Sequence, residues 1–230
     1  MTQTEPDIAR PRAPCLHFPL AGTLQEAGGA DALTVQGPHR FHRIGSTMGY
    51  QPLSLKTVCR LPTDLHLRNE GTISLWVSPL ETLAVAAPMQ REDFLSDHPP
   101  RTTGSMNTII NDRIRNYHWE FFRHSVDVRG DVDTQVLVKN PWFRPLALSS
   151  RPLPACGAWS QLLFLQEGDH LRAAINGEWL LDVHDSPTDN HGPVLNTGRI
   201  GIRLMYQTRM CFRNLKVWSR ARDGKNVTHG

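Results

Sequence analysis

Hydrophobic and polar residues alternate along much of the chain, which is the pattern of β-strands with one buried face. The clearest example is GTISLWVSP at 71–79, where Ile73, Leu75 and Val77 alternate with small polar residues and with Trp76. A strand with this period turns Ile73, Leu75 and Val77 toward the core. The pattern therefore predicts that Trp76 lies on the opposite face.

Turn signals divide the second half of the chain into short strands. The segment TQVLVKNP repeats the alternation with Val136 and Val138 inward, which leaves Lys139 on the other face. The pair Asn176-Gly177 separates two alternating runs and predicts a type I′ hairpin, because both residues tolerate positive φ. Helical periodicity is confined to the short stretch QREDFLSD. The sequence predicts an all-β fold, a two-sheet antiparallel jelly-roll sandwich.

Length and composition favour one domain. A chain of 230 residues with 39% hydrophobic content can bury a single core. We expect a flexible polar segment at 1–14, one β-sandwich domain at 15–220 and a flexible tail at 221–230. The irregular stretch from Leu80 to Thr108 is long for a loop inside a domain, and such loops are usually functional or mobile.

Charge and targeting signals limit the classes of partner that we expect. The net charge is +3 with basic residues spread along the chain, which argues against a nucleic-acid partner. The acidic, polar first residues do not form a signal peptide, and no run approaches the roughly 20 apolar residues of a membrane helix. We therefore expect a cytoplasmic protein without a membrane partner, of unknown oligomeric state. The four cysteines are expected to be buried free thiols rather than disulfide or zinc ligands: Cys15, Cys59, Cys156 and Cys211.

The segment NYHWEFFR at 116–123 mixes aromatic and charged residues, and strand alternation separates the two kinds. Three aromatic side chains fall on one face, which we take as the core face: Tyr117, Trp119 and Phe121. His118 and Glu120 then share the other face. Arg123 falls formally on the core side, but a bulge near the strand end would turn it outward.

Residues of other strands could lie on the same surface as His118. By the same alternation, Trp76, Lys139 and Arg203 fall on non-core faces. If these strands are neighbours, an aromatic ring, a histidine and two cations share one surface. An indole stacks on the apolar face of a sugar, and Arg or Lys binds a carboxylate, so this surface suits an acidic saccharide. The alternative interpretation is that His118 and Glu120 simply belong to a solvated sheet face.

Three segments together resemble the YesU-like bacterial family of unknown function, whose members have a concanavalin A-like lectin/glucanase sandwich. The segments are YHWEFFR at 117–123, VLVKNPWF at 136–143, and GPVLNTGRIGIRLM at 192–205 followed by FRNLKVW at 212–218. The resemblance implies a jelly-roll fold and a role in plant cell-wall polysaccharide use, particularly rhamnogalacturonan. This chain departs from the family pattern with Asn116 before Tyr-His and Leu204 within Arg-x-Met.

Alternation and the resemblance together give the candidate site. The candidate catalytic residues are His118, Glu120 and Tyr117. The candidate substrate-binding residues are Trp76, Arg123, Lys139, Asn140, Trp142, Arg203, Met205 and Tyr206.

The first functional hypothesis is an enzyme acting on uronate- or rhamnose-containing oligosaccharides, as a lyase or a hydrolase. In β-elimination His118 would be the base and Tyr117 or Tyr206 the acid. The clamp on the substrate carboxylate would be a cation: Arg203, Lys139 or Arg123. Hydrolysis needs two facing carboxylates, and the sequence offers Glu120 without an identifiable partner. Lyase chemistry is therefore preferred over hydrolysis.

Two further hypotheses stay open. A non-catalytic carbohydrate-binding domain would need little more than Trp76, Trp142 and hydrogen-bonding groups. An accessory subunit would use the same face to contact another protein. A second titratable group within about 3 Å of His118 at the floor of a groove would favour catalysis. A groove floor of aromatic and amide groups would favour binding. An exposed patch rich in Trp and Phe would favour the accessory role.

No metal or cofactor is expected in the site. His118 and His124 would lie about 20 Å apart along one strand, too far to share an ion. The segment DVHDSPTDNHG at 182–192 is rich in oxygen ligands, so a structural calcium is the alternative there, although an ordinary polar turn is preferred.

Overall fold

A computed structural model describes residues 13–28, 32–54, 57–60, 70–80, 115–127, 130–140, 144–151, 153–186, 192–195 and 209–219. Every regular element in these ranges is a β-strand. The strands are β1 (Leu16–Phe18), β2 (Thr34–Gln36), β3 (His39–Ile44), β4 (Thr47–Pro52), β5 (Val58–Arg60), β6 (Glu70–Pro79), β7 (Tyr117–Asp127), β8 (Gly130–Lys139), β9 (Arg144–Ser149), β10 (Ser160–Glu167), β11 (His170–Ile175), β12 (Glu178–His184) and β13 (Met210–Ser219).

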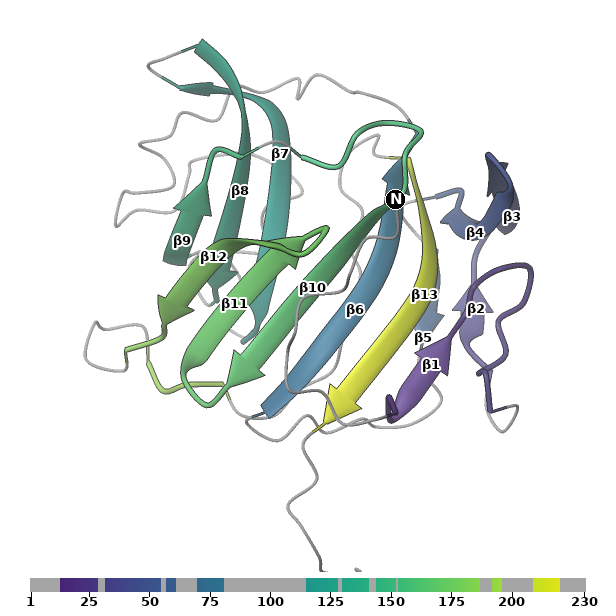
Figure 1. Ribbon diagram of the computed structural model, residues 1–230, viewed down its shortest axis with the longest axis horizontal. Helices are drawn as coiled ribbons and strands as arrows, with labels where there is room; N and C mark the ends of the chain where they lie inside the picture. The colour runs from purple at the N-terminus through teal and green to yellow at the C-terminus, as the bar shows by residue number, and fades with distance from the viewer. Residues whose placement is uncertain are drawn as a thin grey trace, which may run out of the picture.

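The strands form one large sheet and two small ones. The eight-stranded sheet has the order β12-β11-β10-β6-β13-β4-β3, with β1 also paired to β13. The three-stranded sheet has the order β7-β8-β9, and β2 pairs with β5. Figure 1 shows β10, β6 and β13 side by side in the large sheet and β7, β8 and β9 as a separate group. All pairings are antiparallel, so the prediction of an all-β antiparallel sandwich is confirmed.

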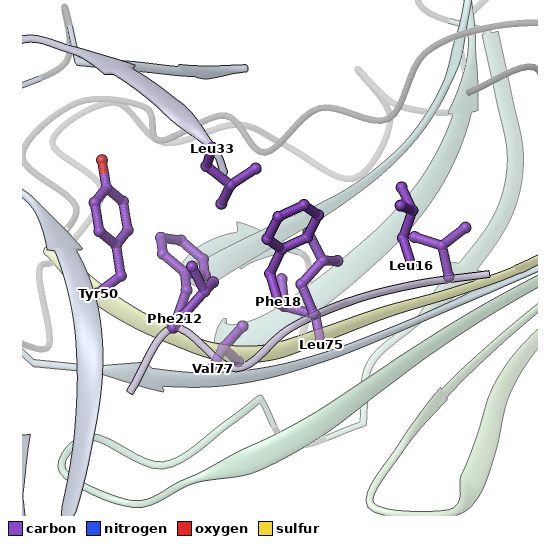
Figure 2. Packing of buried hydrophobic residues seen from close by; sticks show 10 residues of the cluster. Leu16, Phe18, Leu33, Tyr50, Leu75, Val77 and Phe212 are labelled. Carbon is purple, nitrogen blue, oxygen red and sulfur yellow. The ribbon is translucent and has the colours of Figure 1, made fainter. Parts of the chain in front are cut away.

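One part of the core lies between the large sheet, which includes β1, and the chain around β2. It contains Leu75 and Val77 of β6 and Phe212 of β13, together with Phe18 and Leu33. In Figure 2, Leu33 approaches the other labelled side chains from the far side of the cluster, and the ribbon of β13 bows beneath them. The core therefore occupies the concave side of the large sheet, and the residues that alternate with Leu75 and Val77 point to its convex side.

The other part of the core joins the large sheet to the three-stranded sheet. Leu137 of β8 packs against Leu171, Ala173 and Leu181 of β11 and β12, with Tyr117 and Trp119 of β7 alongside. The inner face of β7 and β8 is thus the one that carries Tyr117, Trp119 and Leu137. The aromatic core face expected for NYHWEFFR is confirmed for Tyr117 and Trp119.

The hairpins form where the turn residues predict them. Asn176 and Gly177 both have positive φ, 49° and 85°, and connect β11 to β12. The side chain of Asn176 also accepts a hydrogen bond from the backbone N–H of Gln161 at 2.8 Å. Gly168, with φ of 64°, turns the chain between β10 and β11. These two turns fix the register of the β10–β11–β12 meander.

All four cysteines are free thiols, as expected, but the prediction that all four are buried is wrong. Cys211 is buried on β13, whereas Cys15 and Cys59 are exposed and Cys156 is partly exposed. The reason is that Cys15 and Cys59 lie on short strands or at strand ends near the periphery, where an apolar neighbourhood in sequence does not ensure cover. Burial raises the pKa of the Cys211 thiol to about 11.

Three expected features lie outside the described residues: the strand expected to carry Arg203 (198–206), the helical stretch QREDFLSD and nearly all of the long segment after Leu80. Across the described ranges, no helix is long and apolar enough to cross a membrane.

Candidate functional site

The outer face of β7 carries the polar half of NYHWEFFR. His118 pairs across the sheet with Val138, and Glu120 pairs with Val136. Because Tyr117 and Trp119 face the core, His118 and Glu120 point to the opposite side of the three-stranded sheet. Their side chains keep 20% and 12% of their surface exposed, so this face is accessible at His118 but largely covered around it.

A polar network surrounds the imidazole of His118. Its Nε2 lies 2.8 Å from Oε1 of Glu120, within ion-pair distance but poorly aligned for a hydrogen bond. Its Nδ1 lies 3.2 Å from the amide nitrogen of Asn140, which also donates to Oδ1 of Asn116 at 2.8 Å. The backbone N–H of Asn140 donates to the carbonyl of Asn116 at 3.0 Å, so the two asparagines are held together by both main chain and side chain.

These contacts select one tautomer of His118. The amide nitrogen of Asn140 has only hydrogens to offer, so Nδ1 of His118 must accept. A neutral ring then carries its proton on Nε2, directed toward the Glu120 carboxylate. Asn140 is 2% exposed, so its amide is a fixed donor. The arrangement orients the imidazole as a donor toward its acidic neighbour rather than leaving Nε2 as a ready proton acceptor.

The Glu120 carboxylate is incompletely satisfied. One oxygen faces His118, while Oε2 is buried and has no hydrogen-bond donor among the described residues. A buried carboxylate oxygen without a donor is costly, and such atoms are usually completed by water or a ligand. A hydroxyl group that reached this face would supply the missing donor.

Behind the outer face lies a buried ion pair that stabilises β7 and β8 against β12. Nζ of Lys139 lies 3.0 and 2.7 Å from the two carboxylate oxygens of Asp185, and the two side chains are 2% and 0% exposed. Nζ also donates to the carbonyl of Gly192 at 2.9 Å. The hydroxyl of Tyr117 donates to the same Asp185 carboxylate. All three protons of the Lys139 ammonium thus have acceptors available.

The hydroxyl of Tyr117 is part of this internal network. It accepts a hydrogen bond from the backbone N–H of Leu195 at 3.0 Å. Burial and the hydrogen bond to Asp185 raise the pKa of Tyr117 well above its usual value of 10. Tyr117 is therefore a neutral hydrogen-bonded core group, directed away from the outer face that carries His118.

The predicted position of Lys139 is wrong. Lys139 pairs with Tyr117 and shares the inner face with Leu137, whereas Val136 and Val138 lie on the outer face beside Glu120 and His118. Alternation could not decide between the two faces because β8 is buried on both: Val136, Val138 and Leu137 are all 0% exposed. Lys139 is thus a structural cation, held away from the surface on which a substrate carboxylate would lie.

The prediction that Trp76 and His118 share one surface is also wrong. Trp76 alternates with Leu75 and Val77 and so lies on the convex face of the large sheet, as predicted for that strand. His118 lies on the outer face of the three-stranded sheet. Since the core separates the two sheets, the two side chains face opposite sides of the sandwich.

The remaining candidates are only partly placed. The pairing of β7 with β8 shifts register between Phe122 and Ser125, so a bulge occurs beside Arg123 as expected, but the side chain of Arg123 is not among those described. Four candidate residues lie outside the described ranges altogether: Trp142, Arg203, Met205 and Tyr206. Asn140 belongs to the His118 network.

Two residues of importance were not singled out from the sequence. Asn116 completes the amide network, and its position directly before the Tyr-His pair was a usable signal. Asp185 neutralises Lys139, but an aspartate in a polar segment 46 residues away gives no sign of such a pairing. Long-range ion pairs depend on which sheets face one another, and strand periodicity does not contain that information.

The described residues contain no group of three His, Cys, Asp or Glu side chains placed to hold a metal ion. The oxygen-rich segment considered for calcium is described at 182–186 and at 192. There the carboxylate of Asp185 is engaged by Lys139 and Tyr117, while Asp182 lies 2.6 Å from Nε2 of His170. Residues 187–191 lie outside the described ranges.

Comparison with solved structures identifies the class of fold. A Bacillus subtilis protein of unknown function with a galectin-like fold superposes with a TM-score of 0.60 at 17% sequence identity, over 90% of this chain and 96% of that one. Domain 4 of AbnA, a GH43 extracellular arabinanase from Geobacillus stearothermophilus solved in complex with arabinotriose, gives a TM-score of 0.56 at 17% identity, over 90% and 92% of the two chains. The protein is thus a galectin-like β-sandwich.

The family follows from the sequence match. The family model described as Domain of unknown function (DUF1961) matches residues 80–217, more than half of the chain, so the chain belongs to this family. The uncharacterized protein YesU of Bacillus subtilis (strain 168) is 25% identical over 158 residues, which span 64% of this chain and 71% of YesU. The resemblance to the YesU-like family is confirmed.

Proposed function

We propose that the protein binds oligosaccharides at the partly exposed part of the outer face of β7, where His118 and Glu120 lie. The observation that carries this proposal is the polar network around His118, in which acceptors and donors converge on a partly exposed sheet face. Sugars are recognised by such fixed, directional groups, because each hydroxyl both donates and accepts. The donor missing at Oε2 of Glu120 is one that a sugar hydroxyl supplies.

The comparisons support the same ligand class. Domain 4 of AbnA, which superposes over 90% of this chain, is solved with arabinotriose. At 17% identity this likeness concerns the fold, so the ligand is carried over only as part of the proposal. Conversely, Leu53 is the one large hydrophobic side chain that is strongly exposed among the described residues, which gives little support to an apolar surface for an accessory subunit.

The test is calorimetric titration with a panel of oligosaccharides that includes arabinotriose and uronate-containing oligomers. Glu120→Gln should weaken binding about tenfold, because a charged hydrogen-bond acceptor is lost while the side-chain volume is kept. Glu178→Gln on β12 is the matched control, since Glu178 is 60% exposed and forms its ion pair with Arg151, outside the His118 network. A panel without any binding, or an unchanged affinity in Glu120→Gln, would reject the proposed site.

Catalysis is the second candidate function, and one contact favours it. Glu120 is a titratable group 2.8 Å from His118, which meets the distance condition for an acid–base pair. Against it, Nδ1 of His118 is engaged by Asn140 and Nε2 faces a carboxylate, so proton abstraction needs a rearrangement of the ring. Non-catalytic recognition is therefore the better-supported function.

Product chemistry separates the two functions. The protein is incubated with uronate- and rhamnose-containing polysaccharide while absorbance near 235 nm and reducing ends are followed separately. Unsaturated products would indicate a lyase acting on a uronate, and reducing ends alone would indicate a hydrolase. If either activity is present, His118→Ala should abolish it. Binding without products supports the non-catalytic function.

A further inference from the structure

A second cluster of sugar-type side chains lies on the opposite side of the sandwich. Arg213 of β13 pairs directly across the sheet with Trp76 of β6, on the convex face. The guanidinium carbon of Arg213 lies 4.8 Å from the ring centroid of Trp76 and 4.7 Å from that of Trp159, which immediately precedes β10. All three side chains are partly exposed. We call these three residues the Arg213 patch.

The position of Trp159 depends on a glycine. A Cβ added to Gly49 of β4 would lie 2.4 Å from Cη2 of Trp159 and 3.1 Å from the carbonyl oxygen of Phe212. Only a residue without a side chain allows the indole to lie this close to β4. The patch therefore combines side chains of β6 and β13 with Trp159, the residue before β10, whose indole lies over Gly49 of β4.

The patch contains donors without acceptors. Nε of Arg213, Nε1 of Trp159 and Oγ of Ser78 are buried and have no hydrogen-bond partner within the described part of the chain. Burial also lowers the pKa of the Arg213 guanidinium from its usual value. The cation is thus partly desolvated by two indole rings, and no carboxylate in the described ranges forms an ion pair with it.

A comparable arginine on the same sheet has an acidic partner. The guanidinium of Arg172 lies 4.6 Å from the ring centroid of Trp179, a stacking contact like that of Arg213. Unlike Arg213, it has the carboxylate of Glu167 at 3.8 Å. The two arginines share the aromatic contact and differ in the acidic partner. The unfilled position at Arg213 is therefore one for an anion.

We propose that the Arg213 patch is a second ligand site and that it takes a sugar bearing a carboxylate. The guanidinium fork binds a carboxylate bidentately, and the adjacent indole of Trp76 offers an apolar surface for a sugar ring. A carboxylate held next to a partly desolvated cation interacts more strongly than one in open solvent. The inference deepens the proposed function and rests on it for the saccharide nature of the ligand, whereas the selectivity for a carboxylate rests on Arg213.

The experiment compares one ligand in charged and neutral form. Binding of trigalacturonic acid, its methyl ester and arabinotriose is measured by calorimetry on the full chain. The acid should bind at least about tenfold more tightly than its ester, and Arg213→Gln should remove that difference. Arg172→Gln, which loses a similar stacked cation, should keep it. Arg213→Lys should give an intermediate result, because it keeps the charge but loses the bidentate fork.

Each outcome bears on one of the two proposals. Equal affinity for acid and ester, or a preference that survives Arg213→Gln, overturns the carboxylate site while leaving saccharide binding intact. Equal losses in Arg213→Gln and Arg172→Gln would indicate general charge attraction and also overturn it. Absence of binding to all three saccharides overturns both proposals. Unfolding curves confirm that each variant is folded, and Glu178→Gln, at an exposed residue that belongs to neither cluster, should leave the preference for acid over ester unchanged.

Discussion

Lys139 and Asp185 form an ion pair that is closed to solvent, and this makes it different from the surface pairs of the same protein. Removing one partner leaves the other charge buried and uncompensated. Lys139→Met should therefore lower the free energy of unfolding by about 3–5 kcal/mol, measured by urea denaturation. The double variant Lys139→Met, Asp185→Leu should recover part of this loss, because no lone charge remains.

The matched control for this prediction is the exposed pair of Arg151 and Glu178. Its atoms are 2.8 Å apart, close to the 2.7 Å of the buried pair, but the side chains are 64% and 60% exposed. Glu178→Gln should change the free energy of unfolding by less than about 1 kcal/mol, as is usual for pairs screened by water. A loss in Lys139→Met no larger than that of the control would show that the buried pair contributes little.

The tautomer of His118 is a second property decided by single residues. Asn140 donates to Nδ1, so the ring should carry its proton on Nε2 when neutral. Nitrogen-15 chemical shifts of the imidazole, recorded above the titration range, distinguish a protonated from an unprotonated ring nitrogen. In Asn140→Leu the donor is absent, and the shifts should move toward a mixture of both tautomers. A neutral ring with its proton on Nδ1 in the native protein would contradict the network.

The sequence predicted the outer position of His118 and the inner position of Tyr117 because β7 has a strong contrast between aromatic and polar residues. It failed for Lys139, since β8 reads VLVK and both faces of that strand are buried. Where apolar residues occupy both faces, an inward lysine and an outward one give the same pattern. The inward position of Lys139 is explained only by the structure, in which the carboxylate of Asp185 lies beside its ammonium group.

Among the elements, β13 has a register shift against β6 directly after Arg213, a residue of the Arg213 patch. Arg213 pairs with Trp76 and Lys216 pairs with Ser74, so β13 has two residues where β6 has one. Asn214, in this bulge, has a φ of 53°, and its amide oxygen accepts a 2.6 Å hydrogen bond from Nε2 of His17. The bulge shifts the alternation by one residue, so that Phe212 before it and Leu215 and Val217 after it all face the core.

The conformation of Asn214 gives a prediction for this element. A non-glycine residue at positive φ is strained, and asparagine tolerates it better than alanine. Asn214→Ala should lower the free energy of unfolding by about 1–2 kcal/mol relative to Asn214→Gly. Both variants lose the contact with His17, so their difference, measured by urea denaturation, isolates the backbone term. Equal stability of the two variants would show that the bulge relaxes when the side chain changes.

Turns and bulges differ in how far sequence reveals them. Asn176-Gly177 was predicted as a hairpin because the pair is specific for positive φ at both positions, and the structure has φ of 49° and 85° there. The bulge at Asn214 was not predicted. The segment FRNLKVW reads as an ordinary strand, and the extra residue is defined only by the pairing with β6. A turn can be predicted from its own residues, whereas the register between strands that are distant in sequence cannot.

At the scale of the whole molecule, two buried tyrosines link stability to pH. Burial raises the pKa of Tyr50 to about 12, and burial with the Asp185 hydrogen bond raises that of Tyr117 further. In the unfolded chain both titrate near 10, so above pH 10 the unfolded state loses protons first. The contribution of these two tyrosines to the free energy of unfolding should therefore be constant below pH 10 and should fall as the pH rises above 10.

Urea denaturation at several pH values between 9 and 11.5 checks this expectation. Tyr50→Phe should flatten the decline, because the titrating hydroxyl is removed. The change should cost little stability at lower pH, since this hydroxyl is buried without a hydrogen-bond partner in the described residues. Tyr117→Phe should flatten it as well, but from a lower starting stability because Asp185 and Leu195 lose a partner. A decline of the same steepness in the double variant would assign it to other groups.

The fold as a whole was predictable and the composition of the site was not. Strand alternation and hairpin signals sufficed for an antiparallel sandwich. They could not show that Trp76 and His118 face opposite sides, because each strand pattern defines an inner and an outer face but not the sheet to which the strand belongs. The single site expected from the sequence is thus two separate clusters, one on each side of the core.

The position of β13 in the large sheet has a consequence for the order in which the nascent protein can fold. β13 is the last described strand in sequence, yet it lies between β6 on one side and β4 and β1 on the other. During synthesis β6 and β4 emerge long before their common neighbour, so the edges that β13 will cover stay unpaired and open to other chains. A ribosome-bound chain that stops before Met210 should remain sensitive to protease, and closure of the sandwich should begin only when residues 210–219 leave the exit tunnel.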